Sequence, residues 1–192
     1  MKIAKCRDSL AAALAGTRSS AQQHTPLERE AFAVMEMAEA YQKDGTTFYK
    51  TGDHVNALAA FWYGAGWLHF GISSGLLVCD SCNRFCFFTG TFEKLPLELT
   101  EKLGEKTHRY ERLLNTARSS VECAAEQATI CNDFSRKVLF IASLYAAQGT
   151  RFSEAGANED ALACFSYGHG WLDAAVTCGY FRITAHGDIF TV

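Results

Sequence analysis

The sequence predicts an all-α protein made of two homologous up-and-down three-helix bundles in tandem, joined by an aromatic and cysteine-bearing connector. Two observations carry this prediction: the chain aligns with itself at an offset of 104 residues, and apolar residues recur at helical spacing in both halves. A third is that the chain has only two prolines, Pro26 and Pro96, which leaves room for long helices. With 192 residues, 48% of them apolar and 20% charged, the chain can bury a core.

The internal repeat is direct evidence for a duplication. Residues 31–77 align with residues 135–181 without a gap, and 17 of these 47 positions are identical. A period this long indicates a duplicated domain rather than a short solenoid repeat. We therefore expect a first repeat over 1–77, a connector over 78–96, a second repeat over 97–183 and a C-terminal tail over 184–192.

Three helices are expected in the first repeat, over about residues 2–16, 25–51 and 53–75. Thr25 and Glu28 flank Pro26 in the pattern of a capping box with proline at the first helical position. Gly52 is expected to end the second helix, and Asp53 to cap the third.

The second repeat is expected to hold helices over about residues 97–122, 130–155 and 158–179. Asn158 is the expected cap of the last helix. Glu159 and Asp160 follow in its first turn, where the helix dipole favours acidic side chains.

The second helix of each repeat shows small and aromatic residues at alternating steps of four and three, which predicts a seam against another helix. The seam positions are Leu27, Ala31, Val34, Ala38, Tyr41, Gly45, Phe48 and Gly52 in the first repeat, and Cys131, Ser135, Val138, Ala142, Tyr145, Gly149, Phe152 and Gly156 in the second.

Glycines recur inside both third helices, as Gly64 with Gly168 and Gly66 with Gly170. Each interior glycine costs a helix about 1 kcal/mol relative to alanine, so we expect a neighbouring backbone to approach closely there. The residues predicted to serve as a structural signature are Gly52, Tyr63, Gly66, Trp67, Gly156, Gly170 and Trp171.

Residues 156–181 resemble the signature of an archaeal family known only as domain of unknown function 357. The matching residues are Ser166, Tyr167, His169, Gly170, Trp171, Leu172, Asp173, Ala174, Gly179 and Phe181. The first repeat shares Tyr63, Gly66 and Trp67 of this pattern but has Ala65 for the histidine and His69 for the aspartate. The resemblance implies a small three-helix bundle in each half, and it implies no reaction.

One candidate ligand-binding site comprises Tyr167, His169 and Asp173. His169 and Asp173 are four residues apart and share a helix face, so the carboxylate can orient the imidazole in a small-molecule or metal pocket. The alternative is a hydrogen-bonded pair that holds the helix in register. One histidine and one aspartate do not complete a metal site.

A candidate metal site comprises Cys79, Cys82 and Cys86 in the connector. The Cys-x-x-Cys spacing suits zinc, an iron–sulfur cluster or a redox pair. The alternative is a set of free cysteines in an apolar connector. A fourth ligand would have to come from Cys6, His69 or His108, and the cysteines interpreted as packing residues are Cys123, Cys131, Cys164 and Cys178.

Basic residues gather over 102–118, but glutamates are interleaved with them, which favours a solvated helix face over a nucleic-acid surface. The net charge of −3 agrees with this interpretation. The basic residues are Lys102, Lys106, His108, Arg109, Arg112 and Arg118.

Residues 54–79 contain no charged side chain and are long enough to cross a bilayer. Their aligned copy carries Glu159, Asp160 and Asp173, so a buried helix of a cytoplasmic protein is expected rather than a membrane span. No nucleotide-binding or hydrolase motif is present in the sequence. The leading expectation is a non-enzymatic interaction or scaffold module with a protein partner. The alternative is a metal- or small-ligand-binding protein, or an enzyme, that uses the cysteine cluster or the Tyr167/His169/Asp173 face.

Overall fold

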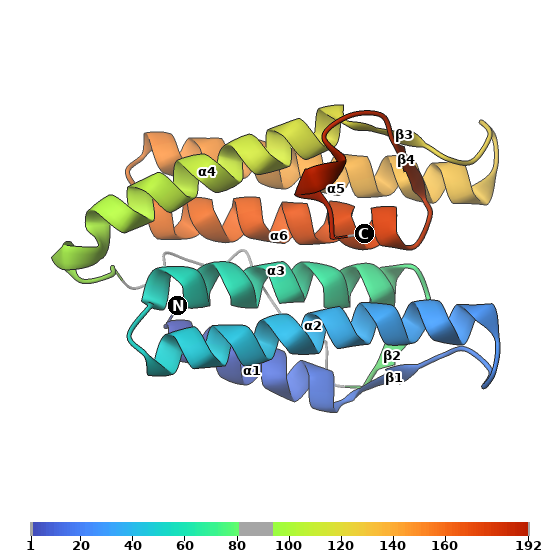
Figure 1. The fold of residues 1–192 in the computed structure, drawn as a ribbon, viewed down its shortest axis with the longest axis horizontal. Helices are drawn as coiled ribbons and strands as arrows, with labels where there is room; N and C mark the ends of the chain where they lie inside the picture. The colour runs from blue at the N-terminus through green and yellow to red at the C-terminus, as the bar shows by residue number, and fades with distance from the viewer. Residues whose placement is uncertain (1, 81–93, 192) are drawn as a thin grey trace.

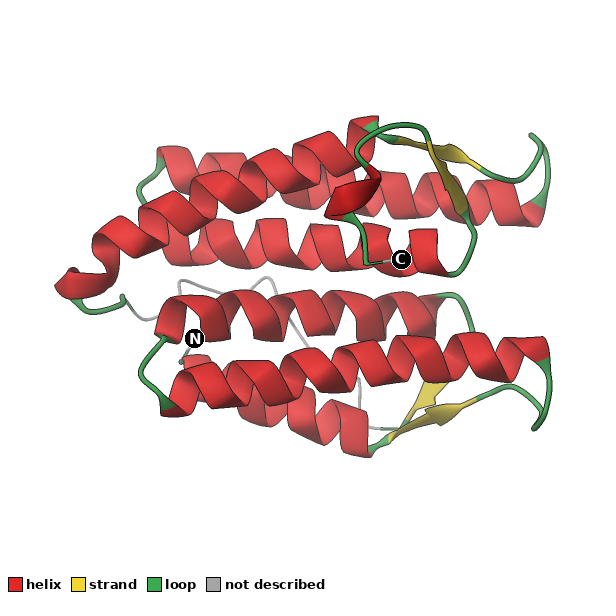
Figure 2. Cartoon of the chain, in the orientation of Figure 1, coloured by secondary structure: helices red, strands yellow, loops and turns green. Residues whose placement is uncertain are grey.

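The computed structural model describes residues 2–80 and 94–191 and confirms an all-α protein made of two tandem helical repeats (Figures 1 and 2). The elements of the first repeat are α1 (Ile3–Ala15), β1 (Thr17–Ser19), α2 (Pro26–Lys50), α3 (His54–Ser73) and β2 (Leu77–Cys79). Those that follow are η2 (Leu97–Leu99), α4 (Thr100–Ser119), β3 (Val121–Cys123), α5 (Ile130–Glu154), α6 (Asn158–Thr177), β4 (Phe181–Ile183) and η3 (Gly187–Ile189).

The first repeat begins its second and third helices where the capping residues predict. The Thr25 side chain accepts a hydrogen bond from the backbone N–H of Glu28 at 3.2 Å, and the Glu28 carboxylate accepts one from the backbone N–H of His24. Asp53 caps α3 in the same way, accepting from the N–H of Asn56 at 3.2 Å. These caps satisfy donors that a helix leaves unpaired at its first turn.

The predicted cap of α6 is wrong. Asn158 is the first helical residue, and the capping position is Ala157, which aligns with Asp53 and has no side-chain oxygen. Glu159 and Asp160 do lie in the first turn, and both are buried.

Each repeat also contains a short antiparallel strand pair that the helical pattern did not predict. β1 pairs with β2, with Arg18 opposite Val78, and β3 pairs with β4, with Glu122 opposite Arg182. The pairs join the end of the first helix of each repeat to the end of its third. Strands of three residues are too short to show an alternating pattern in the sequence.

The third helices, α3 and α6, lie side by side and run in the same direction through the middle of the molecule (Figure 1). α2 packs on α3, while α4 and α5 pack on α6. Most residues of the two central helices are buried, which agrees with the apolar composition of α3 and leaves several polar residues of α6 inside the protein. Among the described helices, none is long and apolar enough to cross a membrane.

The predicted seam is buried through its middle and exposed at its ends. Ala31, Val34 and Ala38 are fully buried, whereas Leu27 is 62% exposed and Phe48 36% exposed. The predicted packing role was also wrong for Cys131, which aligns with Leu27 and is exposed.

The repeated glycines mark two different close approaches. A Cβ on Gly66 would lie 2.6 Å from the carbonyl oxygen of Tyr167, and one on Gly170 would clash with the carbonyl oxygen of Tyr63. This pair therefore lets the two repeats touch backbone to backbone. Gly64 instead faces its own repeat, where a Cβ would lie 3.1 Å from the carbonyl oxygen of Ala38.

Candidate functional site

Asp173 is the centre of a buried polar cluster that joins both repeats and the C-terminal tail. It is fully buried on α6, and its carboxyl group accepts a hydrogen bond from the hydroxyl of Tyr63 on α3. The tail residue Thr191 donates twice to it, from the backbone N–H at 2.8 Å and from Oγ1 at 2.7 Å. Three donors satisfy this buried carboxyl group, as the cost of burying it demands.

His169 lies one turn before Asp173 and is 4% exposed. Its ring lies edge-on to Tyr63, with centroids 5.4 Å apart, and near the tail residue Phe190, with centroids 6.5 Å apart. Burial lowers the pKa of His169, and the neighbouring Asp173 carboxylate opposes that shift. Within the described residues, Nε2 of His169 has no hydrogen-bond partner.

A second polar pair lies across the same interface in the aligned positions. The Tyr167 hydroxyl is 2.7 Å from Nδ1 of His69; Tyr167 aligns with Tyr63, and His69 aligns with Asp173. Burial lowers the pKa of His69 to about 4, so its imidazole is neutral at neutral pH. Each repeat therefore offers a tyrosine to a polar residue of the other.

The two interface tyrosines are held by aromatic neighbours from their own second helices. Tyr41 lies 4.4 Å from Tyr63, and Tyr145 lies 4.3 Å from Tyr167, measured between ring centroids. Burial raises the pKa of both Tyr63 and Tyr167, and the charge of Asp173 raises that of Tyr63 further. Both phenols therefore remain protonated.

The structure thus separates the three residues of the predicted ligand-binding face. His169 and Asp173 meet Tyr63 and the tail, whereas Tyr167 meets His69. The sequence analysis predicted Tyr63 only as part of the structural signature and did not predict its contact with Asp173. Tyr63 and Asp173 are 110 residues apart, so no local sequence pattern predicts their contact. The tail residue Thr191 aligns with none of the described residues of the first repeat, so the duplication gives no indication of its role. A ligand-binding role for this face stays a prediction.

The predicted metal site falls mostly outside the described residues, which include Cys79 but not Cys82 or Cys86. Cys79 ends β2, and its Sγ lies 3.6 Å from the carbonyl oxygen of Ala13. Of the proposed fourth ligands, Cys6 is buried and His108 lies 3.8 Å from Glu111. Among residues 2–80 and 94–191, no three or more histidine, cysteine or acidic side chains gather as a metal site would require. Zinc or an iron–sulfur cluster on the connector stays a prediction.

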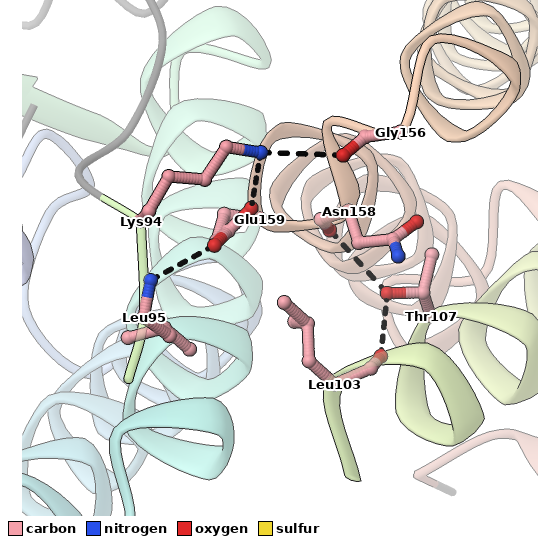
Figure 3. Close-up of polar contacts among 7 residues, drawn as sticks. All are labelled: Lys94, Leu95, Leu103, Thr107, Gly156, Asn158 and Glu159. Atoms are coloured by element: carbon pink, nitrogen blue, oxygen red, sulfur yellow. Dashed lines mark hydrogen bonds and ion pairs between the residues drawn. The ribbon is translucent and has the colours of Figure 1, made fainter. Parts of the chain in front are cut away.

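The end of the connector is attached to the start of α6 (Figure 3). Buried Glu159 accepts hydrogen bonds from the backbone N–H of Leu95 at 2.9 Å and from Nζ of Lys94 at 3.4 Å. Lys94 also donates to the carbonyl oxygen of Gly156 at 3.2 Å. Nearby, the hydroxyl of Thr107 donates to the carbonyl oxygen of Leu103. An acidic side chain at a helix N-terminus therefore holds the chain that enters the second repeat.

Several basic side chains of α4 contact groups of the protein itself. Lys102 pairs with Asp53 at 2.8 Å, Lys106 lies over the ring of Tyr110, and Arg118 donates to Ser143 at 3.2 Å. Part of this basic face therefore contacts the rest of the protein, whereas the sequence analysis interpreted the face as solvated.

A cleft of about 410 Å³ opens where the second helices begin and the third helices end. Aligned residues of the two repeats line this cleft, Leu27 with Cys131 and Leu76 with Tyr180. Burial raises the pKa of Cys178 in this cleft to about 12, and the nearby Glu30 carboxylate contributes to the rise. The Cys178 thiol is therefore protonated and is a poor nucleophile or metal ligand.

The fold and its cross-repeat site define a tandem helical-repeat protein. The chain belongs to the family described as protein of unknown function (DUF357), whose model matches residues 7–77 and again residues 109–181. This confirms the resemblance and its two tandem copies. No curated protein and no solved structure matches the chain.

Proposed function

We propose that this protein is a non-enzymatic interaction module that binds another protein. The observation that carries the proposal is that the buried polar groups already bind one another. Three donors from α3 and the tail form hydrogen bonds with the carboxyl group of Asp173. His69 likewise lies against Tyr167. These groups hold the two repeats together, which leaves the outer helices as the surface for recognition.

The outer surface supports this proposal because it exposes large apolar side chains. Phe32 on α2 is 53% exposed, and Phe140 on α5 is 66% exposed. Phe140 lies one turn before Leu144, which is 45% exposed, and neighbouring exposed apolar residues are typical of sites that contact other proteins. A cytoplasmic location is part of the proposal and stays a prediction.

Quantitative affinity capture from the source cells tests this function. The tagged full chain is compared with a tagged helical bundle of similar size and charge. The proposal expects one protein to be enriched in near-stoichiometric amount with the full chain only. Repeated captures with and without chemical crosslinking that enrich no protein would contradict it.

A metal- or small-ligand-binding protein is the second candidate, favoured by Nε2 of buried His169 beside Asp173, which has no hydrogen-bond partner among the described residues. Anaerobic purification followed by metal and sulfide analysis tests it. Near-stoichiometric zinc or iron that disappears in Cys82→Ser or His169→Ala, with the fold intact, would support this candidate. Metal-free wild-type protein would remove its metal-binding form.

A further inference from the structure

The outward face of α5 carries an apolar stripe with the spacing of a helix-packing seam. Its residues, at steps of three and four, are Lys137, Phe140, Leu144, Ala147 and Arg151. Phe140 is 66% exposed and Leu144 45% exposed, whereas Val138, Ala142 and Tyr145 on the opposite side of α5 are buried. The stripe is thus the free face of a helix whose other face is already packed.

The fold does not need these apolar residues, as the first repeat demonstrates. On α2, the positions aligned with Phe140 and Leu144 are Glu36 and Ala40, and both are exposed. The helices have the same length and the same buried seam. The apolar stripe is therefore a difference between the repeats that packing inside the protein does not explain.

Basic side chains flank the apolar centre of the stripe. Arg136 and Lys137 lie at the N-terminal end of the apolar centre and Arg151 at its C-terminal end, and all three are exposed. None of the ion pairs within the described ranges includes these three residues. Asp133 and Glu154 lie beyond them at the two ends. A partner that places carboxylates at the two ends of the apolar centre would complement the three basic side chains.

We propose that this surface of α5 binds an amphipathic helix of another protein, with an apolar stripe and acidic residues at each end of it. The inference rests on the proposed interaction function and names its surface. Alternating steps of three and four suit helix-on-helix packing at a shallow crossing angle. Lys137 and Arg151 are about 21 Å apart along the helix axis, which corresponds to a partner helix of roughly four turns. Only two large apolar residues anchor the contact, so the association is expected to be micromolar.

The test uses a designed, fluorescently labelled helical peptide with leucines at the central seam positions and glutamates at both ends of the seam. A matched peptide carries lysines in place of the glutamates. Binding is measured by fluorescence anisotropy to the wild type and to Phe140→Glu/Leu144→Ala, which installs the residues of the first repeat. The matched control protein is Glu36→Gln/Ala40→Ser, altered at the aligned positions of α2.

The expected result is micromolar binding of the glutamate peptide to the wild type and to the α2 control. Affinity should fall at least about tenfold in Phe140→Glu/Leu144→Ala and by a similar factor for the lysine peptide. Unchanged binding to Phe140→Glu/Leu144→Ala, equal binding of both peptides, or no saturable binding would each overturn the inference. Binding of the wild type to anionic vesicles, without binding of the peptide, would assign the stripe to a membrane instead and would overturn it too.

Affinity capture separates a failure of this surface from a failure of the proposed function. If the wild type enriches a protein and Phe140→Glu/Leu144→Ala enriches it equally, the function stands and the α5 surface is wrong. If the wild type enriches no protein, the proposed function itself fails.

Discussion

The hydroxyl of Tyr63 in the first repeat donates a hydrogen bond to the carboxyl group of Asp173 in the second, and both side chains are buried. The aligned residues Tyr167 and His69 lie 2.7 Å apart across the same interface. The duplication has therefore kept a tyrosine on each side and has changed only the group that each tyrosine meets. The partner of the tyrosine is a carboxylate in one pair and an imidazole in the other.

Removing the Tyr63 hydroxyl should destabilise the protein more than removing its counterpart. Tyr63→Phe leaves a buried carboxyl group short of a donor, which is expected to lower the free energy of unfolding by about 1–3 kcal/mol. Tyr167→Phe should cost about 1 kcal/mol because its partner is a neutral imidazole. Urea denaturation of both variants measures the difference, and an equal or smaller loss in Tyr63→Phe would show that the carboxyl contact is not the stronger one.

Alanine at the glycine contact between the repeats should be severely destabilising. A Cβ on Gly66 would meet the carbonyl oxygen of Tyr167 at 2.6 Å, and that oxygen belongs to a helix that cannot shift alone. We expect Gly66→Ala to lower the free energy of unfolding by roughly 3 kcal/mol or more. Gly104→Ala is the control, because a Cβ on this α4 residue meets no atom of the described residues within 4 Å.

The control should behave in the opposite way. Alanine in place of a helical glycine with free space around it is expected to stabilise by about 0.5–1 kcal/mol. Thermal melting of the two variants and the wild type tests both expectations. The melting temperature should fall in Gly66→Ala and rise in Gly104→Ala. A mild effect of Gly66→Ala would mean that the two repeats do not approach as closely as the structure indicates.

The C-terminal tail should be needed for full stability although it lies outside both helical repeats. Phe190 is 7% exposed against His169, and Thr191 supplies two of the three donors to Asp173. Deleting residues 184–192 is expected to cost about 3–5 kcal/mol. Thr191→Val keeps the backbone donor and should cost only about 1 kcal/mol. A deletion variant as stable as the wild type in urea would contradict this role of the tail.

Stability should fall as the pH drops from 6.5 towards 4 because of His69. Burial lowers its pKa from 6.5 to about 4, so in this window the unfolded chain binds a proton that the folded protein does not. The loss is at most roughly 3 kcal/mol and is complete below pH 4, while nothing is lost above pH 6.5. His169 adds a change of the same sign, since its pKa is also lowered by burial.

The variant His69→Gln isolates the contribution of His69. Free energies of unfolding are measured between pH 4 and pH 7 for the wild type and the variant. The slope of stability against pH should be shallower for His69→Gln in this window. Identical slopes would mean that His69 is not kept neutral by the fold.

Much of the fold could be predicted because the duplication places the same structural residues in both halves of the sequence. The same seam, glycines and tryptophans occur twice, and the capping residues Thr25 and Asp53 mark helix starts by local chemistry. The cap of α6 was missed because Ala157 lacks the side chain that Asp53 provides. The three-residue strands were missed because their pairing joins residues that are distant in the sequence, such as Arg18 and Val78.

The candidate site was only half predictable for a related reason. Helical spacing places His169 and Asp173 on one face of α6, and the structure brings them together. Spacing alone does not show which residues of the other repeat they contact. The sequence analysis therefore did not predict Tyr63 as the partner of Asp173 or His69 as the partner of Tyr167. The exposed stripe around Phe140 was visible only after the structure showed which face of α5 is buried.

The most direct test of the account compares partner capture by Tyr63→Phe and by Phe140→Glu/Leu144→Ala, at a temperature where both variants are folded. We expect Tyr63→Phe, which alters the buried interface between the repeats, to capture as much partner as the wild type despite its lower stability. Phe140→Glu/Leu144→Ala should keep the stability of the wild type and lose the partner. Loss of capture in Tyr63→Phe, with full capture by Phe140→Glu/Leu144→Ala, would contradict a role of the α5 surface in binding. It would show instead that binding depends on the buried polar residues.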